Sequence, residues 1–130
     1  MYVTYPGFET GRCSVSRLLS LPFGHADCFL LELQKGGSSP GYVLIDGGRK
    51  ETQYPPLMDY LQKLGIPSID LLILTHLHGD HLGWLDQVVL SVPVTEAVLP
   101  YGPLGLDSDY LEREGMEREF CQTVMDYRRL

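Results

Sequence analysis

The sequence predicts an α/β (α+β) fold in which helices cover a mixed sheet. Short apolar segments alternate with helix patterns in the order β-β-β-α-β-α-β-α. The 130 residues are 44% hydrophobic, which is sufficient for one core. No internal repeat, low-complexity tract or linker divides the chain, so we expect a single domain over residues 1–130.

Three strands are expected in the first part of the chain. Residues 16–22 and 27–33 are rich in apolar side chains, and the turn at residues 23–26 separates them. Residues 42–45 follow a polar loop with glycine and proline pairs, and they end at the Asp-Gly-Gly of residues 46–48.

A helix and a buried strand should follow. Apolar residues recur at the i, i+3, i+4, i+7 spacing of a helix face, at Leu57, Tyr60, Leu61 and Leu64. Two prolines precede this pattern, and Gly65 stands where a C-terminal cap belongs. Residues 70–74 are almost entirely apolar, which predicts a strand buried on both faces.

The remaining elements are two helices and a strand. A helix should begin near Leu82 and end before Pro93, because proline prevents its continuation. Residues 94–99 are expected as a strand. A capping-box spacing and an apolar stripe predict a final helix over residues 109–130.

Composition and charge exclude several classes of protein. No apolar stretch is long enough to cross a membrane, and the N-terminus does not resemble a signal peptide. Three cysteines without a CxxC pair suit reduced thiols, so we expect a cytoplasmic protein. The net charge of −7 repels phosphate backbones, which makes nucleic acid an unfavourable partner.

The segment that carries chemistry is Thr-His-Leu-His-Gly-Asp-His at residues 75–81. His76 and His78 stand two positions apart, so an extended backbone sends both imidazoles to one side, where they can share a metal ion. Asp80 and His81 follow a glycine turn and can bind a second ion close to the first. These ligands suit one or two Zn²⁺ ions, or else Mn²⁺ or Fe²⁺. A lone loop histidine usually binds no metal, but this cluster favours a catalytic metal site.

The pattern His-x-His-x-Asp-His, which follows an apolar strand and Thr75, resembles the signature of the metallo-β-lactamase superfamily. The resemblance implies the αββα layers of that fold, here the first half only. It also implies a zinc hydrolase of an ester, an amide or a phosphoester, in which Asp80 binds metal and orients a metal-activated water. Histidine at position 78 is similar to the hydrolases, because the di-iron oxidoreductase branch has glutamate there.

A segment near the N-terminus resembles one branch of that superfamily. Residues 23–31 look like the Gly-x-Gly-Asp-(small)-x-Leu-Ile segment of the ComEC-like competence proteins, with Ala26 in place of the second glycine. In that branch the turn lies beside the metal site. The resemblance therefore makes His25 and Asp27 candidates for substrate contacts or for support of the ligands, although a turn histidine without a role is an equal alternative for His25.

Residues 42–48 resemble the first motif of the superfamily. Its aspartate supports the metal-binding loop through hydrogen bonds, and the resemblance assigns this role to Asp46, with Thr75 beside it. Groups of this kind fix the orientation of metal ligands.

The resemblance covers about residues 16–99. Family members also use a third histidine, a bridging aspartate and a final histidine from later in the chain, whereas this sequence has no histidine after His81. We therefore expect either a truncated hydrolase that needs further ligands, or an inactive half-domain or oligomerising binding module with weak or no metal binding. A homodimer or a missing C-terminal half would cover the apolar sheet face that a first half exposes. Nucleic acid stays a possible partner by resemblance alone.

Overall fold

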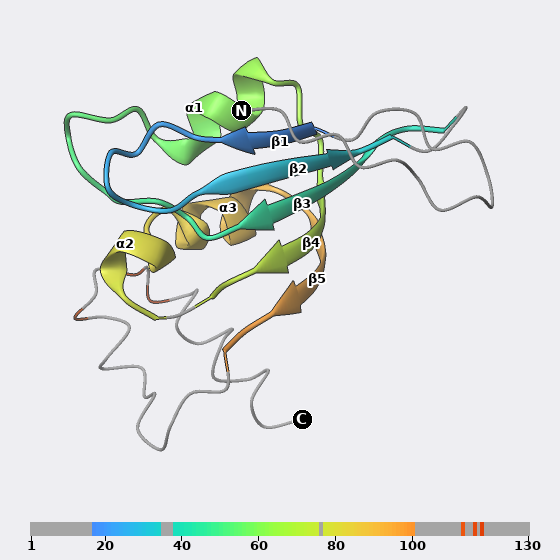
Figure 1. The fold of residues 1–130 in the computed structure, drawn as a ribbon. Coiled ribbons are helices and arrows are strands. Elements are labelled where there is room, and N and C mark those ends of the chain that lie inside the picture. Colours follow the sequence, from blue (N-terminus) through green and yellow to red (C-terminus); the bar gives the residue numbers. More distant parts are fainter. Residues whose placement is uncertain are drawn as a thin grey trace.

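The computed structural model describes residues 17–34, 38–75 and 77–100, together with Arg113, Met116 and Arg118. Within these residues the strands form a mixed sheet accompanied by short helices (Figure 1). The elements are β1 (Arg17–Ser20), β2 (Phe29–Leu33), β3 (Gly41–Ile45), α1 (Leu57–Lys63), β4 (Ile69–Ile73), α2 (Gly79–Leu82), α3 (Leu85–Ser91) and β5 (Val94–Val98). The α/β class and the mixed sheet are therefore confirmed.

The sheet has the strand order β1-β2-β3-β4-β5. Strands β1, β2 and β3 are joined as antiparallel neighbours, while β3, β4 and β5 run parallel. Short connections suit the antiparallel pairs, whereas the parallel pairs require crossovers, which α1 and the α2–α3 segment supply. Figure 1 shows that β3 and β4 end on the side of the sheet where α2 lies.

One face of the sheet packs against α1 and α3. Leu30, Leu44 and Leu72 pair across β2, β3 and β4, so their side chains form one row on the same face. All three are almost completely buried, and they share a hydrophobic cluster with Leu57 of α1 and Leu85 of α3. This core holds the ends of β3 and β4 in fixed register.

The predicted burial of the fourth strand on both faces is wrong. In β4, Ile69 and Leu72 are buried, but Asp70 is exposed and Leu71 and Ile73 are only half-buried. Asp70 lies near the start of this interior strand, where its Oδ2 accepts a hydrogen bond from the backbone N–H of Tyr42 at 2.7 Å. An almost continuous apolar run therefore did not distinguish a strand covered on one face from one covered on both.

The helix expected from near Leu82 is divided in two. Gly83 ends α2 with φ +38° and ψ −113°, values that a helix cannot continue through, and α3 begins at Leu85. A Cβ at position 83 would lie 2.1 Å from the carbonyl oxygen of Gly48 and 2.4 Å from that of Gly47. The close approach of two backbone segments therefore requires glycine here.

The predicted final helix, residues 109–130, lies outside the described residues except at three positions. Arg113 and Arg118 are helical, and Met116 is buried in the hydrophobic cluster. A search of the described residues finds no helix with the length and apolar character needed to span a membrane.

Candidate metal centre

The candidate site lies at one edge of the sheet, where four segments meet. Asp46 directly follows β3, Thr75 lies just after β4, and Asp27 precedes β2. Because β2 is antiparallel to β3 while β4 is parallel to it, the start of β2 meets the ends of the other two strands. His81 approaches the same place from α2.

Asp46 is the centre of the hydrogen bonds in this site. Its Oδ1 accepts the backbone N–H of Thr75 at 2.7 Å, and its Oδ2 accepts the Thr75 hydroxyl at 2.6 Å. The same Oδ2 lies 2.8 Å from Nδ1 of His81. Asp46 is 2% exposed, so these donors replace the water that a buried carboxylate loses.

The backbone at Asp46 is unusual, with φ +59° in the left-handed region. Aspartate tolerates this region better than most residues, and strained backbone of this kind often occurs at functional sites. The backbone after Asp46 is hydrogen-bonded to the α2–α3 segment. The N–H of Gly47 donates to the carbonyl of His81 at 2.6 Å, and the carbonyl of Gly47 accepts from the N–H of Trp84 at 3.0 Å. The Asp-Gly-Gly segment and the loop after β4 therefore form one connected unit.

The two nitrogens of the His81 ring have different surroundings. Nδ1 faces the Asp46 carboxylate, which can only accept a hydrogen bond, so we assign a proton to Nδ1. In the neutral ring this leaves the lone pair of Nε2 for another partner. Nε2 lies 3.5 Å from Oδ2 of Asp80, and the ring itself is only 7% exposed.

This pair of atoms fits a metal ion. Two ligands about 2.1 Å from a tetrahedral zinc ion lie roughly 3.4 Å apart, close to the 3.5 Å between His81 Nε2 and Asp80 Oδ2. Imidazole and carboxylate are also the donor types found in catalytic zinc sites. His81 and Asp80 are therefore suited to share one ion, with Asp46 behind the imidazole as its hydrogen-bond partner.

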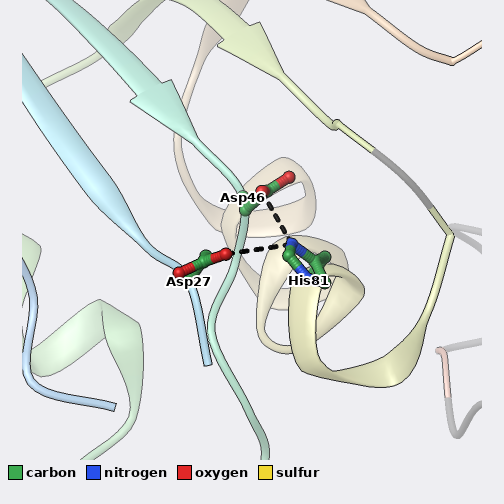
Figure 2. A group of neighbouring side chains, drawn as sticks. All are labelled: Asp27, Asp46 and His81. Carbon is green, nitrogen blue, oxygen red and sulfur yellow. Dashed lines mark hydrogen bonds and ion pairs between the residues drawn. The ribbon is translucent and has the colours of Figure 1, made fainter. Parts of the chain in front are cut away.

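Asp27 extends this group on its exposed side (Figure 2). Asp27, Asp46 and His81 offer ligand atoms that lie within 4.8 Å of one another, which makes them a second candidate metal group. The carboxylate of Asp27 is 3.9 Å from Nδ1 of His81. An ion in this group would have to take Nδ1 away from Asp46, so the hydrogen bonds favour the arrangement through Nε2.

The other histidines considered in the sequence are His76, His78 and His25. His76 lies outside the described residues, so the convergence of His76 with His78, Asp80 and His81 stays a prediction. His78 is exposed at the N-cap of α2, where its carbonyl accepts the N–H groups of His81 and Leu82 at 2.9 Å. His25 is also exposed, and within the described ranges it forms no hydrogen bond or ion pair with the Asp27–Asp46–His81 group.

Cys28 lies next to this group but does not offer a thiolate. Burial raises the pKa of the Cys28 thiol strongly, and the nearby Asp46 carboxylate raises it further. The thiol therefore stays protonated at neutral pH, which removes it as a metal ligand or nucleophile. Cys28 therefore acts as a small buried apolar residue.

A charged pair close to the site, Lys50 and Asp86, was not predicted from the sequence. Nζ of Lys50 lies 2.5 Å from Oδ2 of Asp86, which is 0% exposed, and 5.8 Å from the centre of the Trp84 ring. One signal was available: Asp86 stands four positions after Leu82, on the helix face that carries the buried residues. A charged residue on such a face predicts a counter-ion.

An open hollow lies beside Asp80. It has a volume of about 500 Å³ and is lined by Arg49, Lys50, Glu51, Gly79, Asp80 and Gly83. The residues after the Asp-Gly-Gly segment thus form one wall, and α2 with its terminal glycine forms the other. A molecule in this hollow would lie next to Asp80.

Comparison with known families connects this geometry to one of them. Residues 21–111 match the sequence profile of the metallo-beta-lactamase superfamily, a range that contains every element from β2 to β5 and all of the candidate site. Searches of curated proteins and of solved structures gave no significant match. The matched range is well over half of the chain, and the chain therefore belongs to the metallo-beta-lactamase superfamily.

Proposed function

We propose that this protein is a metal-dependent hydrolase that uses zinc, with Mn²⁺ or Fe²⁺ as alternatives. The observation that carries the proposal is the orientation of His81. Its Nδ1 is bonded to the buried Asp46, and its Nε2 lies 3.5 Å from Asp80. A histidine that donates one N–H to a carboxylate and directs its other nitrogen to a second ligand is typical of a metal site.

The residues of the proposed site divide into metal ligands and residues that hold the ligands in place. The metal ligands are His76, His78, Asp80 and His81, and Asp80 also orients the attacking water. When bound, the metal would activate that water and polarise the scissile bond of an ester, an amide or a phosphoester. Asp46 keeps the proton on Nδ1 of His81, and Thr75 fixes the Asp46 carboxylate through two hydrogen bonds.

The branch of the superfamily is a finer proposal. The turn at residues 23–26 leads to Asp27, whose backbone carbonyl accepts the N–H of Gly48 at 2.9 Å. This hydrogen bond ties the segment that resembles the ComEC-like proteins to the Asp-Gly-Gly segment of the site. It supports a role for Asp27, and by proximity in sequence for His25, in contacts with substrate or with the ligands.

Self-association is also a proposal. The four histidines of the sequence are His25, His76, His78 and His81, so a histidine ligand beyond these four would have to come from another chain or from residues not included here. Within the described sheet β5 pairs only with β4, and Val98 on this edge strand is 53% exposed. Such an edge can pair with a second copy. Light scattering at micromolar concentration tests this, since a monodisperse monomer would contradict it.

The hydrolase proposal is tested with zinc-loaded protein and a panel of chromogenic esters, amides and phosphoesters. We expect turnover of at least one class in the wild type, and its loss after removal of zinc or in Asp80→Ala. Lys63→Gln is the matched control, because Lys63 is an exposed charged residue on α1 that does not line the hollow. Turnover that persists without metal, or in Asp80→Ala at wild-type rate, would contradict the proposal.

A further inference from the structure

The hollow beside Asp80 has a second property, because two of its lining side chains are cations. We propose that Arg49 and Lys50 form a subsite that binds an oxyanion group, a phosphate or a carboxylate, of a small substrate. The inference rests on the proposed function in one respect: it takes Asp80 as a ligand of the metal. It goes further by naming the residues that select the substrate and the chemical class that they select.

Lys50 is held in a defined position at the wall of this hollow. Its ammonium group is bonded to the buried carboxylate of Asp86 and lies near the face of Trp84, as described above. Lys50 nevertheless remains 28% exposed. A cation whose position is fixed before the ligand arrives loses little conformational freedom on binding, and preorganisation of this kind strengthens binding. Asp86 is therefore a positioning residue, which acts through Lys50.

Arg49 supplies a more accessible cation. Its side chain is 49% exposed, and its Nη1 donates to Glu51 at 3.0 Å. Exposed ion pairs of this type contribute little to stability, so an oxyanion can replace Glu51 at low cost. The guanidinium group carries five N–H donors in a planar arrangement that matches phosphate and carboxylate. The backbone of Arg49 is fixed, since its carbonyl accepts from Nε1 of Trp84 at 3.1 Å.

The balance of charge in the hollow favours an anion once metal is bound. Among the lining residues that the structure describes, the cations Arg49 and Lys50 are accompanied by the acidic side chains of Glu51 and Asp80, and Lys50 is also paired with the buried Asp86. A divalent cation on Asp80 changes this balance to positive. A neutral ester or amide could accept hydrogen bonds from the two cations only through an uncharged oxygen, whereas an oxyanion would form stronger hydrogen bonds in which both partners are charged.

The size of the hollow and the charge of the whole chain restrict the ligand further. A volume of about 500 Å³ lies inside the range of roughly 300–1,000 Å³ that is usual for small-molecule sites. The net charge of −7 disfavours an extended polyanion, whose many phosphates would meet repulsion outside the subsite. A small substrate with one oxyanion group fits both observations.

The chain has a built-in reporter for the test. Trp84 is the single tryptophan of the sequence, and it contacts both the Arg49 backbone and the Lys50 ammonium group. Inorganic phosphate and acetate are titrated into the full chain at constant ionic strength, while the emission of Trp84 is recorded. Saturable binding of either anion supports the subsite, and the tighter one identifies the oxyanion. Failure of both to bind would overturn the proposal.

Variants show whether Arg49 and Lys50 are responsible. Arg49→Gln should weaken binding of the anion at least about fivefold, as expected for loss of a charge-assisted hydrogen bond, while Lys63→Gln should leave it unchanged. Lys50→Met alone would remove a cation that is paired with the buried carboxylate of Asp86, so it is combined with Asp86→Leu, and the double variant removes both charges. This double variant should also bind at least about fivefold more weakly. Wild-type affinity in Arg49→Gln would overturn the proposal.

Zinc analysis separates this result from the proposed function. Arg49→Gln should retain as much zinc as the wild type, because Arg49 has no role in holding the metal. The titration is repeated on metal-free protein, where binding should be weaker yet still depend on Arg49. A chain that holds no zinc would therefore contradict the hydrolase, while the effect of Arg49→Gln would still decide the subsite.

Discussion

Nδ1 of His81 lies 2.8 Å from Oδ2 of Asp46, and this contact joins two motifs that stand 35 residues apart. The carboxylate is fixed on its other side by Thr75, so the loop after β4 and the start of α2 are held by one buried group. The position of the imidazole therefore depends on a residue that need not touch the metal itself. The first prediction follows from this dependence.

Asp46→Asn should weaken zinc binding by roughly 10–100-fold, the usual effect of removing a partner that orients a ligand. Asparagine has nearly the same shape and also tolerates the left-handed backbone at this position. It offers only one acceptor oxygen, however, and its amide group would face donors from Thr75 or His81. Competition with a fluorescent zinc chelator measures the change, and an unaltered affinity would contradict the supporting role.

Gly83→Ala should destabilise the fold much more than Gly65→Ala. Both glycines have positive φ, so both substitutions carry a backbone cost of at least about 1 kcal/mol, and at Gly83 the ψ of −113° lies outside the left-handed helical region and adds to it. Only at position 83 would the new Cβ meet backbone atoms, at 2.1 Å, while nothing lies within 4 Å of it at position 65. Urea unfolding of the two variants measures the difference, and equal losses would show that the crowding at Gly83 is relieved without cost.

Lys50→Met should lower the free energy of unfolding by about 3 kcal/mol, because it removes the ammonium group that is paired with the buried carboxylate of Asp86. The double variant Lys50→Met/Asp86→Leu should recover most of that loss, since it buries no charge. Chemical denaturation of both variants checks this. A double variant that is less stable than Lys50→Met alone would contradict this prediction. It would mean that the two side chains stabilise the fold by more than the neutralisation of each other's charge.

Glu32 should make stability depend on acid. The hydrogen bond from Arg17 lowers the pKa of the Glu32 carboxyl, and a further one from Gln34 acts in the same direction. A lowered pKa in the folded state gives a stabilisation that is present above the ordinary pKa of 4.5 and is lost as the pH falls through the lower folded value. Unfolding measured from neutral pH down to about pH 3 should show a smaller loss in Glu32→Gln than in the wild type.

The sequence predicted the parts of the fold that depend on local pattern. The periodicity of Leu57 and Leu61 together with Gly65 predicted α1, and short apolar runs predicted the strands, because these signals lie within a few residues. The division of the helix at Gly83 could not be predicted in this way. It results from the close approach of Gly47 and Gly48, which are more than 30 residues away along the chain.

In the candidate site, too, local sequence patterns indicated some residues, while contacts between residues far apart in the sequence could not be predicted from them. Spacing alone indicated His76, His78, Asp80 and His81 as ligands, whereas Asp46 was indicated only by resemblance, since no local pattern shows which carboxylate meets His81. The pair of Lys50 and Asp86 was missed for the same reason, because it joins a loop to a helix through tertiary packing.

The zinc content of the purified chain tests the central claim most directly. Zinc is added, the protein is desalted, and metal per chain is measured by elemental analysis for the wild type, Asp80→Ala and the double variant His76→Ala/His78→Ala. The proposed site predicts that the wild type retains about one zinc ion or more, and that both variants retain much less while Lys63→Gln matches the wild type. Equal zinc in all four proteins, or none in the wild type, would contradict a metal centre built on Asp80 and His81.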